Sequence, residues 1–309
     1  MTLAARIRTR LRRDYFHWHY VRAVRAVLGT PPLTRGVAPF AVLSMVHHRD
    51  VLSYLVAVKS FCRQINPSRV IVVCDPSIDA ADRAIFRRHV PHIELRDAAE
   101  FQHPDIPRGG TWERLHALAQ YSREAYVVQL DADTVTIDSV SEIRDAIFGA
   151  NGFVLGEKTE QELATFAETR RIAQTHVPES GHAHVQTLAE LAMGDAGLGT
   201  GRKYVRGCSG FTGFPQSATM CDALLDFSRR MHAQVGPRWS DWGTEQVSSN
   251  YLVANASGTS VLPFPKYGTP DAESPDTAFL HFIGPMRFVN RRYEKVSMNA
   301  LDALRSAGG

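Results

Sequence analysis

One stretch decides the fold class of this chain: Ala125-Tyr126-Val127-Val128-Gln129-Leu130-Asp131-Ala132-Asp133. Its valines and leucine favour a strand, and the apolar run ends in two carboxylates separated by one small residue. In an open α/β sheet, ligands gather beyond the carboxyl ends of the strands, where Asp131 and Asp133 are expected. Two close carboxylates repel each other unless a cation lies between them, and aspartate oxygens suit Mg²⁺ and Mn²⁺. By itself, the stretch fits a solvated acidic turn better, so a functional interpretation depends on other residues.

Strand and helix signals alternate around this stretch. Apolar runs predict strands over residues 40–46, 70–74, 93–95, 152–156 and 203–205. Helical patterns predict helices over residues 51–61, 79–89, 112–123, 159–174 and 299–306. The run at 70–74 is continuously apolar, which is typical of a strand buried on both faces. The alternation predicts an α/β fold, namely a single domain with a mostly parallel central sheet.

Composition places the chain among globular proteins with a large core. It has 309 residues, of which 44% are hydrophobic and 22% charged. The four cysteines are scattered, without a spacing typical of zinc sites or disulfide frameworks, which favours a reducing cytosol. No run reaches transmembrane length, and the N-terminus lacks the apolar core of a secretory signal. We therefore expect a cytoplasmic protein. The formal charge of +3 does not by itself indicate nucleic-acid binding.

Residues 1–30 differ from the rest of the chain because they hold seven arginines against one acid, Asp14. Apolar residues recur there at steps of three or four and share one helical face: Leu3, Ile7, Leu11, Tyr15 and Trp18. Arginine beside aromatic residues suits the headgroups of an anionic membrane. We expect a basic helix over 1–30 at the inner face of a membrane, a main domain over 38–290, and a C-terminal helix over 291–309. A helix docked on the domain is the alternative; nucleic acid is not an expected partner.

Three further motifs occur after the acidic stretch. They are Cys208-Ser209-Gly210-Phe211, Trp239-Ser240-Asp241-Trp242-Gly243-Thr244-Glu245-Gln246, and Phe279-Leu280-His281-Phe282-Ile283-Gly284-Pro285-Met286-Arg287. The second motif mixes indoles with polar groups, which suits the binding of a sugar. Each motif also has a purely structural explanation, and His281, for example, fits a satisfied core histidine. His182 and His184 lack a third ligand at a clear spacing, so we expect a surface loop there.

Taken in order, Trp112-Glu113-Arg114-Leu115, Asp131-Ala132-Asp133 and the three later motifs resemble a known family. They are similar to motifs of the retaining GT-A glycosyltransferases related to glycogenin and the bacterial lipopolysaccharide galactosyltransferases, that is, glycosyltransferase family 8. The resemblance covers roughly residues 38–290. It implies a GT-A fold and transfer of a hexose from a nucleoside diphosphate sugar, with UDP as the expected nucleotide. The implied acceptor is a glycan or a lipid-linked glycan.

The resemblance also implies roles for individual residues. Metal ligands would be Asp131, Asp133 and His281, with Mn²⁺ preferred over Mg²⁺. Catalytic residues would be Arg114, Glu245 and Gln246, and donor-binding residues would be Asp75, Ser209, Gly210, Gly284 and Arg287. The chain departs from the family where His47-His48-Arg49-Asp50 replace acidic or amide residues near the base. It also departs at Cys208 (family asparagine), Glu245 (aspartate) and Arg287 (lysine).

The expected chemistry follows from the leaving diphosphate, whose developing charge needs stabilisation. A divalent ion supplies it as a Lewis acid, and Arg114 and Arg287 add fixed positive charge. The anomeric carbon becomes oxocarbenium-like. Because the amide of Gln246 is a poor nucleophile, we favour same-face attack guided by the leaving phosphate. In that scheme, Gln246 stabilises positive charge and Glu245 binds donor hydroxyls.

Two other functions fit parts of the sequence. Asp131-Ala132-Asp133-Thr134-Val135 matches the signature of haloacid-dehalogenase-like phosphatases, in which the first aspartate is the nucleophile. Those enzymes usually carry the motif near the domain start and add a late acidic pair, and this chain has neither feature. The other alternative is an inactive GT-A domain that only binds a nucleotide sugar, suggested by the changes at residues 47–50.

Overall fold

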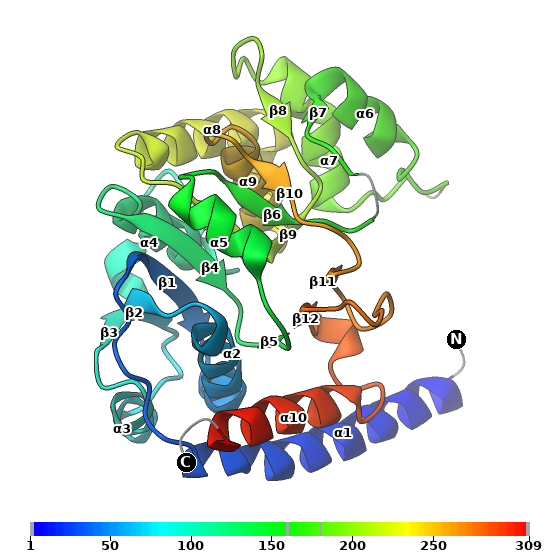
Figure 1. Cartoon of the computed structure of the whole chain (residues 1–309). Helices are drawn as coiled ribbons and strands as arrows, with labels where there is room; N and C mark the ends of the chain where they lie inside the picture. Colours follow the sequence, from blue (N-terminus) through cyan, green and yellow to red (C-terminus); the bar gives the residue numbers. More distant parts are fainter. Residues whose placement is uncertain (1–2, 159–160, 180, 307–309) are drawn as a thin grey trace.

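The computed structural model describes residues 3–158, 161–179 and 181–306 and has a seven-stranded sheet at its centre (Figure 1). The strand order is β10-β6-β9-β4-β1-β2-β3. The strand bounds are β1 Ala38–Val46, β2 Pro67–Cys74, β3 Ile93–Asp97, β4 Tyr126–Leu130, β6 Phe153–Leu155, β9 Cys208–Phe214 and β10 Ser260–Val261. Neighbours pair in parallel except β9, which is antiparallel to both β4 and β6. The mostly parallel sheet predicted from the sequence is therefore confirmed.

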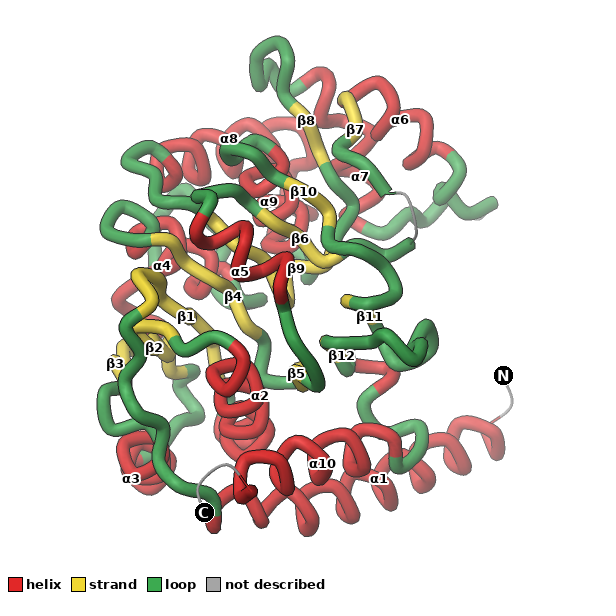
Figure 2. The backbone as a smooth tube through the Cα atoms, viewed as in Figure 1, coloured by secondary structure: helices red, strands yellow, loops and turns green. Residues whose placement is uncertain are grey.

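Helices cover both faces of this sheet (Figure 2). Their bounds are α2 Val51–Gln64, α3 Ala80–His89, α4 Trp112–Tyr121, α5 Ser141–Phe148, α8 Met220–Val235 and α9 Thr244–Ala254. Successive residues of β1 point to opposite faces. Leu43 belongs to a buried cluster with α4, α8 and α9, whereas Val42 belongs to one with α2 and α5. The sheet is thus buried on both sides, as its apolar strands indicate.

A small second sheet continues from the acidic stretch. It consists of β11 Tyr267–Gly268, β12 Phe279–His281 and β5 Thr134–Thr136, in that order. β12 runs antiparallel to β5 and pairs His281 with Thr134. This register brings a residue near the end of the chain next to Asp133.

The segment between β6 and β9 forms an excursion of its own. It contains β7 Ala164–Thr165, α6 Phe166–Gln174, α7 Val185–Ala192 and β8 Lys203–Tyr204. The helix predicted over 159–174 is shorter than expected because Thr165 caps its N-terminus in a capping box with Glu168. Residues 159 and 160 lie outside the described residues. The strand predicted at 203–205 is β8, and the motif that begins at Cys208 is itself a strand.

The two terminal helices lie side by side at one end of the molecule (Figure 1). They are α1 Leu3–Val24 and α10 Arg292–Ser306, so α10 begins earlier than the predicted residue 299. Tyr20 of α1 stacks on Tyr293 of α10 with ring centroids 4.1 Å apart, and both belong to a buried cluster with α2. The later part of α1 therefore contributes to the core, which fits the alternative of a helix docked on the domain. None of the described helices is long and apolar enough to span a membrane.

Candidate functional site

The predicted acidic site forms at the carboxyl end of β4. The backbone holds it on two sides, because Asp131 N donates to Gly210 O (2.8 Å) and Phe282 N donates to Asp133 O (2.8 Å). The first bond comes from the pairing of β4 with β9, and the second extends the pairing of β5 with β12. Two sheets therefore fix the backbone on which the carboxylates are mounted.

Asp131, Asp133 and His281 converge with their side chains. His281 Nε2 lies 3.1 Å from Asp133 Oδ1 and 3.8 Å from Asp131 Oδ2. One ligand atom from each of the three residues lies within 4.8 Å of the others. Asp133 and His281 are buried, and Asp131 is partly exposed. The arrangement offers two carboxylate oxygens and one imidazole nitrogen, a donor set that fits Mn²⁺.

Arginines occupy the outer oxygens of the two carboxylates. Arg114 Nη1 pairs with Asp131 Oδ1. Arg287 approaches Asp133 Oδ2 with Nη2 at 2.6 Å and Nε at 2.8 Å. The inner oxygens, Asp131 Oδ2 and Asp133 Oδ1, are the ones nearest His281 Nε2. Each carboxylate is thus oriented by an arginine and still presents one oxygen to the centre of the cluster.

Arg114 is held in a buried network below Asp131. Its Nη2 lies 3.1 Å from Glu245 Oε1, and the other oxygen, Oε2, accepts from Thr111 Oγ1 (3.0 Å) and Ser209 Oγ (3.3 Å). Thr111 adopts a left-handed φ of 71° just before α4, a conformation that is strained for a threonine. Both Glu245 oxygens are therefore engaged, and the geometry makes Glu245 a positioning residue for Arg114. No sequence motif predicted a role for Thr111.

Arg287 has a second partner that the motifs did not predict. Its Nη1 lies 3.0 Å from Oδ1 of Asp50, which is buried at the start of α2. Gly284 and Arg287 also line a cavity of about 340 Å³ together with Asp50 and Arg49. The guanidinium is therefore fixed between two carboxylates at the edge of an open space, where it can meet an anion.

The electrostatics of the cluster differ between its members. Burial disfavours the ionised form of Asp133, but His281 and Arg287 outweigh burial, so the pKa of Asp133 lies below its ordinary value. Burial raises the pKa of Asp131, and Arg114 offsets only part of this effect. Burial by itself lowers the pKa of His281, but Cys208 and Asp133 raise it well above its ordinary value. The protonated imidazole of His281 thus supplies positive charge beside the two carboxylates, and a bound cation would be suited to supply the same charge there.

Gly210 and Cys208 determine where the His281 ring lies. A Cβ on Gly210 would be 2.1 Å from His281 Cε1, so only glycine leaves room for the ring. Cys208 Sγ lies 3.2 Å from His281 Nδ1, on the ring edge opposite the carboxylates. The close packing of His281 thus explains why residue 210 is a glycine. The family resemblance implied a role for Gly210 in donor binding.

The two remaining predicted residues lie apart from the ion-pair network. Gln246, in the first turn of α9, is half-buried and makes no side-chain hydrogen bond within the described ranges. Asp75 follows β2 and lies 3.1 Å from His47 Nδ1, at the carboxyl ends of two neighbouring strands. Its position suits a ligand at the edge of the sheet.

Two features that the sequence singled out are structural. Trp239 is fully buried and donates from Nε1 to Ser228 Oγ (3.0 Å), so it is a core residue rather than a sugar platform; Trp242 is exposed. His184 accepts from Gln186 N at the start of α7. Within the described part of the chain, neither His182 nor His184 joins a three-ligand cluster. His48, Asp79 and Asp82 do converge, but the two aspartates form the capping box of α3.

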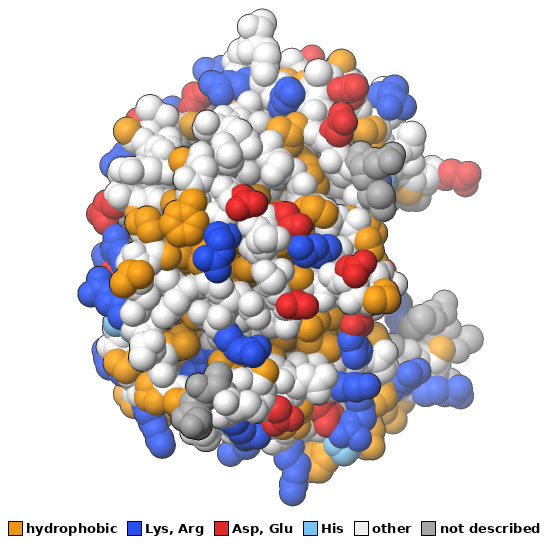
Figure 3. Space-filling model, in the orientation of Figure 1, with side chains coloured by type: hydrophobic (Ala, Val, Ile, Leu, Met, Phe, Trp, Pro, Cys, Tyr) orange, Lys and Arg blue, Asp and Glu red, His pale blue; other side chains and the backbone are white. Residues whose placement is uncertain are grey.

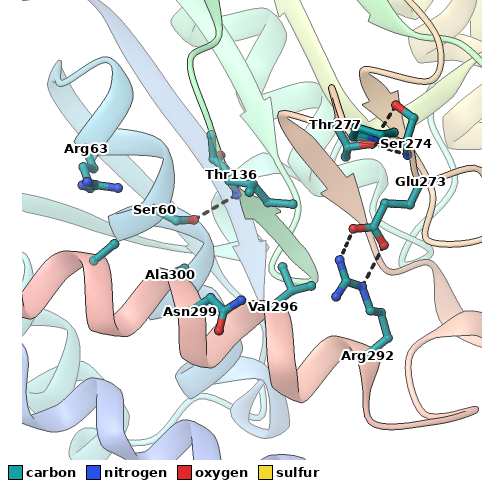
Figure 4. Close-up of a pocket in the computed structure, with 13 residues that line it drawn as sticks. Ser60, Arg63, Thr136, Glu273, Ser274, Thr277, Arg292, Val296, Asn299 and Ala300 are labelled. Carbon is teal, nitrogen blue, oxygen red and sulfur yellow. Dashed lines mark hydrogen bonds and ion pairs between the residues drawn. The ribbon is translucent and has the colours of Figure 1, made fainter.

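A separate cavity of about 310 Å³ lies between α2, β5 and α10 (Figure 4). It is lined by Ser60, Thr136 and Arg292, among others, and Thr136 N donates to Ser60 Oγ (3.1 Å). Thr136 ends the strand that begins beside Asp133. The cavity therefore lies at the far end of β5 from the acidic cluster, and it contains none of the predicted site residues.

Comparison with known proteins adds the class of fold. No protein-family model matches the sequence, and no curated protein sequence matches it. The apo structure of the WbbM bifunctional glycosyltransferase matches with a TM-score of 0.53 at 14% identity, over 87% of this chain and 51% of that one. The galactosyltransferase LgtC with donor and acceptor sugar analogues matches at 0.44 and 15% identity, over 84% and 95% of the two chains. Mouse xyloside xylosyltransferase 1 in its apo form matches at 0.45 and 14%, over 80% and 98%.

All three proteins are glycosyltransferases, and the WbbM match carries the conclusion about fold. The chain has the GT-A glycosyltransferase fold that its motifs predicted. It spans about half the length of the WbbM structure.

Proposed function

We propose that this chain is a metal-dependent, retaining glycosyltransferase that moves a hexose from a nucleoside diphosphate sugar, expected to be a UDP-sugar, to a glycan or lipid-linked acceptor. One observation carries the proposal. Asp131 Oδ2, Asp133 Oδ1 and His281 Nε2 converge at the carboxyl end of β4, and a guanidinium flanks each carboxylate. Activity and substrates are inferred from this geometry together with the fold.

The residues divide the work of stabilising the leaving group. Asp131, Asp133 and His281 would hold Mn²⁺, which when bound polarises phosphate oxygens as a Lewis acid. Arg287 lies at the edge of the cavity that Gly284 also lines, and its planar guanidinium can pair with two phosphate oxygens. Arg114 favours the ionised form of Asp131 and orients its carboxylate, and Glu245 in turn fixes Arg114. Asp75, near His47, is suited to the nucleoside part of the donor.

The proposal of a retaining mechanism depends on Gln246. Its side chain is free within the described ranges, and it directly follows Glu245, whose oxygens are occupied by Arg114, Thr111 and Ser209. A free amide oxygen can stabilise a developing oxocarbenium ion but is a poor covalent nucleophile. We therefore favour same-face attack, in which the departing diphosphate takes the acceptor proton.

The N-terminal helix suggests where the enzyme works. Leu11 and Trp18 of α1 are 65% and 58% exposed, on the face turned away from Tyr20 and the core. Lys and Arg side chains gather along the edge of the molecule formed by the terminal helices (Figure 3). Exposed apolar groups among arginines suit an anionic membrane surface. We propose peripheral attachment at the inner face of a membrane, which would bring a lipid-linked acceptor within reach.

Donor turnover tests the function directly. Purified full-length protein is incubated with UDP-glucose, UDP-galactose, UDP-N-acetylglucosamine or GDP-mannose and with MnCl₂, and nucleoside diphosphate and inorganic phosphate are measured. We expect slow, metal-dependent release of nucleoside diphosphate from one donor, abolished by EDTA. Release of inorganic phosphate without added phosphatase would favour the phosphatase alternative. Saturable donor binding without any release would instead favour an inactive binding domain.

A further inference from the structure

A polar cavity of about 320 Å³ lies in the α6–α7 excursion. Glu157 and Arg206 line it from two neighbouring stretches of chain. Arg206 is two residues before Cys208, which contacts His281, and Glu157 is two residues after Leu155, which pairs with Cys208. Two extended residues span about 7 Å. Two residues of backbone on each of β6 and β9 therefore join the lining of the cavity to the paired residues Leu155 and Cys208, and Cys208 contacts His281.

A buried carboxylate with an unused oxygen faces this cavity. Glu190 of α7 is 1% exposed, and its Oε1 accepts from Gln186 Nε2 (3.0 Å) and Tyr204 OH (3.2 Å) and lies 3.3 Å from Arg206 Nε. Its Oε2 has no partner among the residues that the structure describes. Glu190 Oε2 is not one of the fully buried side-chain oxygens that lack a partner, so it is accessible and can accept a hydrogen bond from a ligand in the cavity that Glu190 lines.

The remaining lining carries unused groups of both charges. The Glu157 carboxylate, the Lys158 ammonium and the Arg171 guanidinium have no hydrogen bond or ion pair within the described ranges. Leu163 and Ile172 add apolar surface between them. The lining thus offers both hydrogen-bond acceptors and hydrogen-bond donors, together with some apolar area. Such a lining suits a neutral molecule with many hydroxyls better than an anion or a cation.

We propose that this cavity is the acceptor subsite and that it binds a sugar ring of an uncharged glycan, with Glu190 Oε2 accepting one of its hydroxyls. This inference rests on the function proposed above. A second hydroxyl of the bound acceptor attacks from the side of His281. Its oxygen bonds to the anomeric carbon of the donor, the bond from that carbon to the diphosphate oxygen breaks, and the leaving diphosphate takes the electron pair and the hydroxyl proton.

Comparing transfer with hydrolysis of the same donor tests the assignment. The probes are methyl hexopyranosides and lactose, offered with the nucleotide sugar that the full-length protein hydrolyses. Glu190→Gln removes the charge at equal size, Ala164→Trp fills the cavity from β7, and Glu179→Gln is the exposed control. We expect the acceptor KM to rise at least tenfold in both cavity variants, with the rate of donor hydrolysis unchanged. Transfer that stays normal in both variants, or falls only in step with hydrolysis, overturns the proposal.

A binding measurement keeps the test independent of turnover. Saturation-transfer NMR with the same methyl glycosides and lactose should show contact with the wild-type protein and the Glu179→Gln variant. Contact should be lost in Ala164→Trp, whose folding is checked by thermal unfolding. If no donor is turned over but sugar contact disappears in Ala164→Trp, the function fails and the sugar site stands. If no sugar contacts the wild type, the sugar site is refuted.

Discussion

At the scale of single residues, Gly210 controls the ring that completes the acidic cluster. A methyl group there would lie 2.1 Å from His281 Cε1, so Gly210→Ala must push the ring away from the carboxylates. We expect the Mn²⁺ concentration for half-maximal donor hydrolysis to rise at least tenfold, together with some loss of thermal stability, because the displaced ring is buried and leaves its contact with Asp133. Gly29→Ala meets no atom within 4 Å and is the control. An unchanged metal titration in Gly210→Ala would remove His281 from the set of ligands.

Removing the imidazole itself distinguishes a ligand from a core histidine. Because His281 contacts Asp133 and Cys208, His281→Ala should cost some stability in either role. Only a ligand also shifts the metal titration of the folded variant to higher concentration. The deciding measurement is therefore Mn²⁺ binding by the folded fraction, followed by electron paramagnetic resonance.

Asp133 combines a site role with a structural one. Asp133 lies just beyond the end of strand β4, a position at which an exposed side chain is common. Asp133 is instead 5% exposed and pairs with both His281 and Arg287. Breaking a buried pair by removing one partner typically costs about 3–5 kcal/mol. We expect Asp133→Asn to lose activity and also stability, measured by urea unfolding; wild-type stability would contradict the buried network.

How much of the site could be predicted depended on distance along the chain. Asp131 and Asp133 stand together after an apolar run, so local pattern was enough. The contact between Asp133 and His281 depends on the antiparallel pairing of β5 with β12, and that between Asp50 and Arg287 on packing near α2. No local pattern encodes either pairing, and only the family resemblance placed His281 and Arg287 in the site.

At the scale of elements, α1 has an exposed first part and a buried last part. Tyr20 and Val24 at the end of α1, and Val27 in the turn after it, are buried in a cluster with α2 and α10, whereas Leu11, Tyr15 and Trp18 are exposed. Deleting residues 1–14 should therefore leave a folded enzyme that is active on soluble acceptors and binds phosphatidylserine vesicles more weakly. Deleting residues 1–30 should lower the unfolding temperature sharply, because buried aromatic and aliphatic side chains are lost.

A point variant checks the membrane surface without shortening the chain. Trp18→Glu should reduce sedimentation with phosphatidylserine vesicles, and Trp242→Glu, at an exposed tryptophan outside α1, should not. Equal sedimentation of both variants and the wild type would refute attachment through α1.

Elements were predictable from sequence where periodicity was strong, as for α2 and β2. The start of α6 was not, because the capping box at Thr165 and Glu168 outweighed the apolar periodicity before it.

At the scale of the whole molecule, a buried lysine–histidine pair makes folding depend on pH. Lys59 Nζ lies 3.2 Å from His89 Nδ1 and donates to Thr30 Oγ1 (2.8 Å) and Pro31 O (2.6 Å), which ties α2 and α3 to the N-terminal segment. Burial, aided by Lys59, lowers the pKa of His89 to about 4. Between pH 6.5 and about 4, His89 binds a proton in the unfolded chain but not in the folded chain. The free energy of unfolding therefore decreases as the pH falls through this range.

The size of this effect is on the order of 3 kcal/mol, from the gap between pKa values of about 4 and 6.5. Urea unfolding of the wild type and His89→Gln between pH 4 and 7 measures it as a difference between the two proteins. The exposed His176→Gln serves as control. Parallel pH curves for the wild type and His89→Gln would show that His89 carries no such penalty.

The position of β9 also has a consequence for biosynthesis. During translation, β4 leaves the ribosome and can pair with β1. Its other edge pairs with residues 208–214, which are synthesised only after the whole α6–α7 excursion. Until then the nascent chain displays an unpaired apolar strand edge, a template for aggregation. Chaperone demand should therefore peak when translation has passed residue 130 but β9 has not yet left the exit tunnel. Chains stalled before residue 208 should accumulate as insoluble material, and those stalled after β9 is released should not.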